Sequence, residues 1–182
     1  YPLQLLKKLS IATTVVVGYK SEEVVKSIRK AEFPKVDFVV QEQQLGTGHA
    51  AACSKHLWDK DLVLILNGDA PLISEELIND LIETHVKSKA TASIASAFVD
   101  DSNSYGRVIS KNGKIKIVEA KDCTTEEIKE PKINAGIYLF SKDFLKSKVE
   151  KLEQNNAAQE LYLTDLVSMA SDQGLHVNVV SA

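Results

Sequence analysis

The chain has 182 residues, 44% of them hydrophobic and 26% charged, and its 22 basic and 25 acidic side chains give a net charge of -3. This composition is typical of a globular chain with a sizeable core and excludes intrinsic disorder and collagen-like structure. The slight acidic excess argues against a nucleic-acid-binding protein, and no apolar run approaches the roughly 20 residues that a membrane helix needs.

Cysteine usage and the start of the chain bear on the compartment. Cys53 and Cys123 lie far apart in the sequence and belong to no CxxC pattern, which suits a reducing cytosol better than a disulfide scaffold. The first residues, Tyr1-Pro2-Leu3, do not read as a secretory signal. We therefore expect a cytoplasmic protein that consists of one domain and contacts neither nucleic acid nor membrane.

Strand patterns and helix patterns alternate along the chain. β-branched apolar runs predict strands and amphipathic runs predict helices. In chain order we expect a short helix at 3–9, a strand at 13–17, a helix at 21–30, a strand at 36–40, a helix at 47–58, a strand at 61–66, a helix at 74–86, a strand at 91–99, a hairpin at 107–118, a strand at 133–140, helices at 141–154 and 164–173, and a strand at 175–180.

Local signals mark the ends of several elements. Ser21 and Ser74 are expected to cap helices, and Thr124 with Glu127 has the spacing of a capping box. Asn112-Gly113 predicts a type I′ hairpin turn. The alternation of strands and helices predicts an α/β fold with a mostly parallel sheet that is covered on both faces. The hairpin would be an antiparallel insertion at one edge.

The carboxyl ends of the strands are where open α/β sheets bind ligands. The buried strand at 61–66 is followed by Asn67-Gly68-Asp69, so it delivers a carboxylate to this edge. A carboxylate together with substrate phosphates is a usual way of holding Mg²⁺. On this pattern alone, Asp69 and Pro71 could equally form a simple turn.

Two further segments could contact a ligand at this edge. In the loop at 41–50, Gly46 and Gly48 expose backbone N–H groups and the Gln41 amide can both donate and accept. This loop could contact a nucleobase, or it could be a glycine-rich connector in which Thr47 caps a helix. The segments around Gly106, Glu119 and Asn134 offer the polar groups that sugar hydroxyls need, although each could also be a solvated strand end.

Taken together, these segments resemble one known family. The motifs QLGTGHA (44–50), GDxPLI (68–73), YGR (105–107), VExKD (118–122), INxG (133–136) and LYLTD (161–165) occur in the order found in bacterial N-acetylglucosamine-1-phosphate uridyltransferases. These are the amino-terminal part of a bifunctional enzyme that also acetylates glucosamine 1-phosphate. The resemblance implies a Rossmann-like sheet of the sugar nucleotidyltransferase type.

The resemblance also implies a reaction and a set of roles. UMP would be transferred from UTP to N-acetylglucosamine 1-phosphate, giving UDP-N-acetylglucosamine and pyrophosphate, with Mg²⁺ as cofactor. Gln41 and the backbone of Gly46 and Thr47 would contact uracil. Asn67, Gly68 and Asp69 would follow the ribose and phosphates, with Asp69 as the catalytic residue and Mg²⁺ ligand. The sugar would be held by Gly106, Glu119 and Asn134.

The chain departs from the family pattern at several points. Asn67 stands where an aromatic residue is common, and Ala135 where a threonine is frequent. The family's first strand, its glycine-rich phosphate loop and its β-helix acetyltransferase domain have no counterpart in residues 1–182. We therefore expect a partial nucleotidyltransferase domain, inactive alone, from a full-length homotrimer. The alternatives are a non-catalytic module that binds nucleotide sugars, or a nucleotidyltransferase that acts on another sugar 1-phosphate.

Overall fold

The computed structural model describes residues 2–31, 33, 36–70, 73–99 and 104–182. Pro71 and Leu72 of the GDxPLI segment lie outside this part. In chain order the elements are α1 (Pro2–Lys8), β1 (Thr13–Val17), α2 (Ser21–Lys30), β2 (Val36–Val40), α3 (Thr47–Cys53), β3 (Leu62–Leu66), α4 (Glu75–Ser88), β4 (Ala92–Phe98), β5 (Arg107–Lys111), β6 (Lys114–Val118), β7 (Lys132–Ser141), α5 (Lys142–Lys148), α6 (Asp165–Asp172) and β8 (Val177–Ser181). Short 3₁₀ turns follow α3, β6 and α5 and precede β7.

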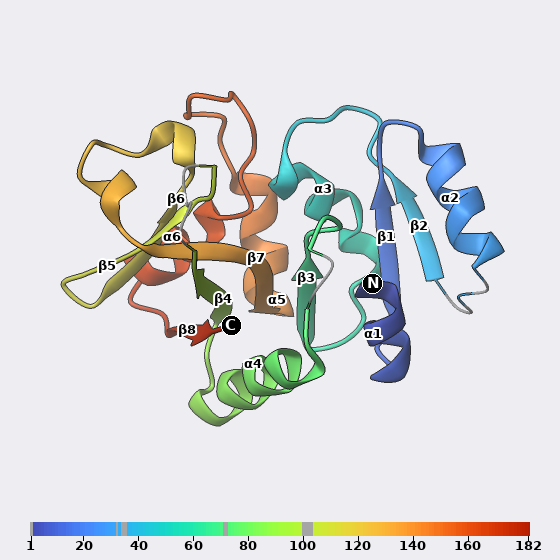
Figure 1. Ribbon diagram of the computed structural model, residues 1–182, viewed down its shortest axis with the longest axis horizontal. Coiled ribbons are helices and arrows are strands. Elements are labelled where there is room, and N and C mark those ends of the chain that lie inside the picture. The colour runs from blue at the N-terminus through green and yellow to red at the C-terminus, as the bar shows by residue number, and fades with distance from the viewer. Residues whose placement is uncertain (1, 32, 34–35, 71–72, 100–103) are drawn as a thin grey trace.

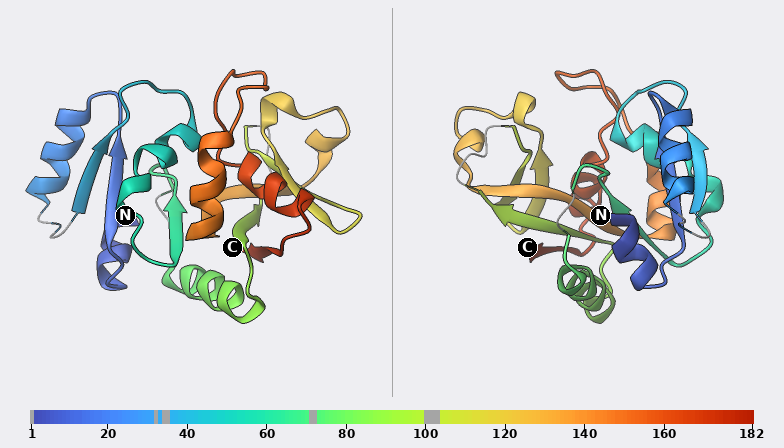
Figure 2. Two further views of the ribbon diagram at one scale, coloured as in Figure 1. Left: turned by 180° about the vertical axis from the view of Figure 1, so that it is seen from behind. Right: turned by 45° about the vertical axis from the view of Figure 1, so that its right-hand side comes forward.

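The strands form two hydrogen-bonded ladders. β1 and β2 pair in parallel, and the other six described strands form a sheet of order β6-β5-β7-β4-β8, with β3 also paired to β7. In Figures 1 and 2, β1 lies between β2 and β3. Within the described residues no ladder joins β1 to the larger sheet.

The α/β fold is confirmed, and the strand directions show why it is a mixed sheet. β7 runs antiparallel to β3, β4 and β5, whereas β8 runs parallel to β4. Four strands, β3, β4, β5 and β8, therefore share one direction, while β7 crosses the middle of the sheet against them. The β5–β6 hairpin lies at one edge as expected, and Asn112 and Gly113 have the positive φ angles (53° and 73°) of a type I′ turn.

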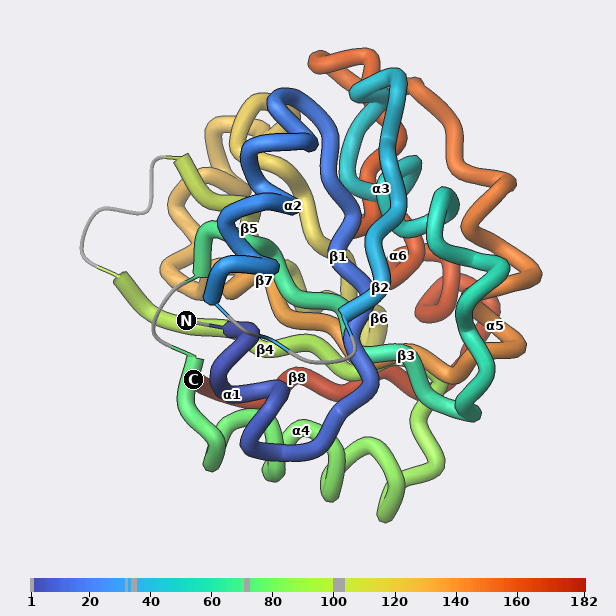
Figure 3. Tube along the Cα trace, turned by 90° about the vertical axis from the view of Figure 1, so that its right-hand side faces the viewer, coloured from blue at the N-terminus to red at the C-terminus, as the bar shows by residue number. Residues whose placement is uncertain are grey.

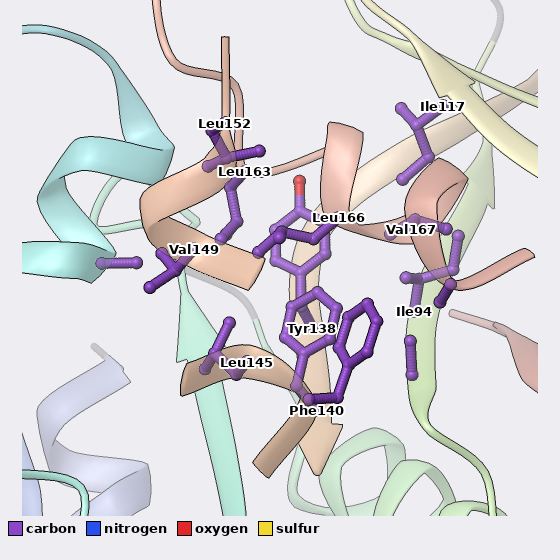
Figure 4. Close-up of a cluster of buried hydrophobic side chains, with 14 of the residues drawn as sticks. Ile94, Ile117, Tyr138, Phe140, Leu145, Val149, Leu152, Leu163, Leu166 and Val167 are labelled. Atoms are coloured by element: carbon purple, nitrogen blue, oxygen red, sulfur yellow. The ribbon is translucent and has the colours of Figure 1, made fainter. Parts of the chain in front are cut away.

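Residue alternation along β7 separates two cores. Tyr138 and Phe140 point into one core with side chains of α3, α5 and α6, whereas Ile137 and Leu139 point into the other with α4 and α1. This period of two is what a strand buried on both faces requires. Figure 4 shows the first core, with the Tyr138 and Phe140 rings stacked at a centroid distance of 6.2 Å. The sheet is thus covered by helices on both faces.

Several predicted element ends are confirmed and others are wrong. The Ser74 hydroxyl accepts the Leu77 N–H, and Thr124 and Glu127 form the capping box. Ser21, however, does not cap α2: Lys20, with a φ of 55°, occupies the N-cap position and no side chain caps the helix. The helices predicted at 47–58 and 141–154 are shorter, because each changes to a 3₁₀ turn after about two turns of α-helix. None of the described helices is long and apolar enough to span a bilayer.

Candidate functional site

The loop after β2 is held by hydrogen bonds from its first residue. The Gln41 N–H donates to the Val17 carbonyl at 2.7 Å, which extends the β1–β2 pairing by one residue. The Gln41 side chain turns inward, is 9% exposed and donates from Nε2 to the Gly46 carbonyl at 3.1 Å. The residue predicted to contact a base therefore closes its own loop onto Gly46. Figure 3 shows the chain path from β2 into α3.

A distant segment of the chain, residues 161–164, supports the same loop. Leu161 donates its N–H to the Leu45 carbonyl and accepts the Gly48 N–H, both at 2.7 Å. The Leu163 N–H donates to the Thr47 hydroxyl at 3.0 Å. The hydroxyl of Thr47 thus binds another segment and makes no cap bond at the start of α3. The connector alternative for this loop, in which Thr47 caps the helix, is wrong in that respect.

Glu119 lies at the other end of this segment. The Thr164 hydroxyl, which is almost fully buried, donates to Glu119 Oε1 at 3.0 Å. Partial burial raises the pKa of Glu119; the Thr164 hydrogen bond opposes this, while Asp122 and Glu160 add to it. Gly106 packs beside this carboxylate, because a Cβ at position 106 would lie 3.1 Å from Glu119 Oε2. The structure therefore places Gly106 and Glu119 together, as the sequence predicted.

Asn134 completes this group and links it to the loop after β3. Its N–H donates to the Gly106 carbonyl at 2.8 Å, and its side-chain oxygen accepts the Gly136 N–H at 3.1 Å. Gly136, with a φ of 71°, lies against Asn67: a Cβ there would be 2.6 Å from the Asn67 amide nitrogen. Asn67 in turn donates its N–H to the Gly136 carbonyl at 3.0 Å. The amide of Asn67 thus packs on glycine, in the place where the family commonly has an aromatic ring.

Asp69 stands apart from these contacts. It is exposed, and within the described residues it forms no ion pair and no side-chain hydrogen bond. Gly68 beside it faces open space, since an added Cβ would meet no atom within 4 Å. No group of three or more histidine, cysteine, aspartate or glutamate residues in the described chain could hold a metal ion. One free carboxylate fits Mg²⁺ only where substrate phosphates provide further oxygen ligands.

Three side chains of this region carry roles that the sequence did not indicate. Thr164 orients Glu119, although LYLTD was noted only as a motif. Arg107, fully buried, donates from its guanidinium to the Ile128 and Tyr105 carbonyls, so it links the backbone next to Gly106 to the 3₁₀ turn at Glu127–Lys129. His49 contacts Gln41. Each partnership joins residues far apart in the sequence or depends on a side-chain direction, which motif spacing does not encode.

Comparison with known proteins decides the family. The profile of the family described as "Nucleotidyl transferase" matches residues 1–181. The chain belongs to the nucleotidyl transferase family. Within it, the chain is 45% identical over 157 residues to the "Bifunctional protein GlmU" of Fervidobacterium nodosum, covering 86% of this chain and 34% of that protein. It is 42% identical over 171 residues to that of Clostridium novyi, covering 92% and 37%. The resemblance inferred from the motifs is confirmed.

The chain spans about a third of the length of these curated relatives. Solved structures of other proteins share its fold. A putative glucose-1-phosphate thymidylyltransferase from Bacillus anthracis matches all of this chain and 74% of its own, with a TM-score of 0.79 at 21% identity. The inositol-1-phosphate CTP transferase of T. maritima matches all of this chain and 71% of its own, with a TM-score of 0.75 at 16% identity. These two identities are low, so they bear on the fold of the nucleotidyl transferases and not on the substrate.

Proposed function

We propose that this chain forms the nucleotide- and sugar-recognition edge of an enzyme that transfers UMP from UTP to N-acetylglucosamine 1-phosphate. The observation that carries the proposal is the continuous set of contacts from Gln41 and Gly46, through 161–164, to Glu119, Gly106 and Asn134. These contacts fix a base-reading loop and a cluster of polar groups suited to sugar hydroxyls in one unit. The relatives named bifunctional GlmU support this choice of substrates.

Each group would have a defined task in the reaction. Gln41 and the backbone at Gly46 and Thr47 hold the uracil, while Glu119, Asn134 and the backbone at Gly106 orient the sugar. This positions the sugar phosphate oxygen for in-line attack on the α-phosphorus of UTP: a new P–O bond forms as the bond to the pyrophosphate leaving group breaks. Mg²⁺, when held by Asp69 and the phosphates, supplies positive charge where negative charge develops.

The proposal predicts a separation of binding from stability at Glu119. Glu119→Gln is expected to weaken UDP-N-acetylglucosamine binding about tenfold or more, because hydrogen bonds to a charged group contribute about 1.5–3 kcal/mol. The same change is expected to raise the free energy of unfolding at neutral pH by about 0.5–1 kcal/mol, since it removes a carboxylate whose burial and acidic neighbours disfavour its charge. Calorimetric titration and urea denaturation measure the two effects.

The pH dependence gives the sign of the stability effect. Because the pKa of Glu119 is raised in the folded state, the folded chain binds more protons than the unfolded chain between the ordinary glutamate pKa and the raised pKa. The free energy of unfolding therefore falls as the pH rises through this window and is constant above it. This fall should be smaller in Glu119→Gln. The control is Glu126→Gln, an exposed carboxylate paired with Lys129. Absence of UDP-N-acetylglucosamine binding by the parent chain would contradict the proposal, and equal binding by Glu119→Gln would remove Glu119 from the sugar site.

Metal dependence provides a second prediction. Mg²⁺ alone is expected to bind the chain only at concentrations on the order of millimolar, because the described residues include no group of three or more histidine, cysteine, aspartate or glutamate side chains that could hold a metal ion. Mg²⁺ should instead tighten UTP binding, and Asp69→Asn should abolish this gain. Titrations of UTP with and without Mg²⁺ measure it, with Asp80→Asn on the exposed face of α4 as the control. Tight binding of Mg²⁺ without nucleotide would contradict the assignment.

A further inference from the structure

The amide group of Gln41 is fixed in one orientation. Its Nε2 lies 3.1 Å from the Gly46 carbonyl oxygen and 3.0 Å from His49 Nδ1. A carbonyl oxygen only accepts hydrogen bonds, so the atom facing it must be the amide nitrogen and not the amide oxygen. Both N–H groups of the Gln41 side chain are therefore used within the protein, one by Gly46 and the other by His49.

This orientation also determines which ring nitrogen of His49 carries the proton. A nitrogen that receives an N–H must present its lone pair, so Nδ1 is unprotonated and the ring proton is on Nε2. Nε2 faces the Cys53 sulfur at 3.9 Å, one helical turn away on α3. The sulfur is a weak acceptor, which suits the N–H that this tautomer places opposite it. Gln41, His49 and Cys53 thus form a chain of hydrogen bonds in which every donor faces an acceptor.

This chain of hydrogen bonds leaves the amide oxygen of Gln41 available to a ligand. Within the described residues its Oε1 has no hydrogen-bond partner, and it is not one of the fully buried side-chain atoms without a partner. The free atom is consequently an accessible acceptor. Uracil presents an N3–H donor at the centre of its pairing edge, whereas cytosine presents an N3 acceptor, which would face Oε1 without a proton between them.

We propose that His49 is a positioning residue that, together with the Gly46 carbonyl, restricts Gln41 to the role of acceptor and so strengthens the selection of uridine over cytidine nucleotides by this loop. This inference rests on the proposed function, since it assigns the base preference of the same site. A half turn of the Gln41 amide would place Oε1 against both the Gly46 carbonyl oxygen and His49 Nδ1. Without the Nδ1 lone pair, only the Gly46 carbonyl opposes this rotation, so the amide nitrogen is presented to a base more often.

The test compares binding of UDP and CDP, measured by calorimetry, in the parent chain and three variants. His49→Phe removes the acceptor of the Gln41 N–H. We expect the ratio of UDP to CDP affinity to fall about tenfold, because one neutral hydrogen bond then no longer discriminates between the two bases. His49→Asn supplies a side-chain oxygen near the position of Nδ1, so it should retain most of the preference. His56→Phe, at an exposed histidine in the same part of the chain, should leave it unchanged.

A second measurement needs no ligand and no variant. Long-range proton–nitrogen NMR spectra of the parent chain show which ring nitrogen of His49 carries the proton, and we expect Nε2. A proton on Nδ1 would overturn the inference, as would full UDP preference in His49→Phe. Equal binding of UDP and CDP by the parent chain, or binding of neither, would overturn the proposed uridine specificity and this inference together. UDP preference that persists in His49→Phe overturns the role of His49 alone.

Discussion

Replacing Gly46 with alanine is expected to lower the free energy of unfolding by about 3 kcal/mol and to abolish binding of uridine nucleotides. Gly46 has φ 110° and ψ 177°, a backbone region that only glycine occupies readily. An added Cβ would also lie 2.7 Å from the Leu161 carbonyl oxygen and 2.8 Å from its nitrogen. Both atoms belong to backbone held by hydrogen bonds, so the loop itself must move.

A matched glycine separates the two causes. Gly174, with a φ of 70°, follows α6 and has no atom within 4 Å of an added Cβ. Gly174→Ala therefore adds only backbone strain, which costs about 1–2 kcal/mol, and should leave nucleotide binding intact. Urea denaturation and UDP calorimetry on both variants measure the difference. Equal losses of stability would show that the Leu161 contact does not constrain the loop.

Phe140→Ala is expected to cost about 3–5 kcal/mol of stability, the range for a large aromatic side chain removed from a closed core. Phe140 is fully buried on β7 between the stacked rings of Tyr138 and Phe144, at centroid distances of 6.2 and 6.3 Å. β7 pairs with three other strands and also carries Asn134. A void at Phe140 therefore weakens the strand that carries Asn134, one of the residues proposed to contact the sugar.

The control for this change is another phenylalanine. Phe98 at the end of β4 is 62% exposed and lies under the Lys132 ammonium group. Phe98→Ala should change the free energy of unfolding by less than about 1 kcal/mol. Urea denaturation, fitted with one common m-value for all variants, gives the change in the free energy of unfolding for both substitutions. A loss at Phe98 as large as that at Phe140 would contradict the placement of the core.

Local patterns predicted most elements of this fold but not how the strands pair. Periodicity placed β3, β4 and β7 correctly because each is an apolar run between turn signals. It could not place β7 antiparallel between its neighbours, since strand partners depend on contacts between residues 137–141 and 62–66, far away in the sequence. Ser21 was misassigned as a cap because the left-handed Lys20 that starts α2 carries no recognisable sequence signal.

The same limit applies to the site. Of the residues predicted at strand ends, the structure joins Gly106, Glu119 and Asn134 by direct contacts; their role in binding a sugar stays a prediction. The roles of Thr164 and His49 depend instead on where single side chains point. A threonine in LYLTD or a histidine in QLGTGHA fits a packing position equally well until the partner atoms are known. Motif order therefore predicts which residues form the candidate site, and the structure shows which side chains within it contact one another.

The short segment from Leu161 to Thr164 has a thermodynamic consequence. One end is bonded to the loop that contains Gly46, and the other holds the Glu119 carboxylate. Under the proposed function the base moiety would contact one end and the sugar moiety the other, so a fragment that restrains one end would also restrain the other before the second fragment binds. Such linkage is reciprocal: whatever factor the base moiety contributes to affinity for the sugar moiety, the sugar returns to the base. A joined nucleotide sugar would therefore bind more tightly than the separate affinities of its halves imply.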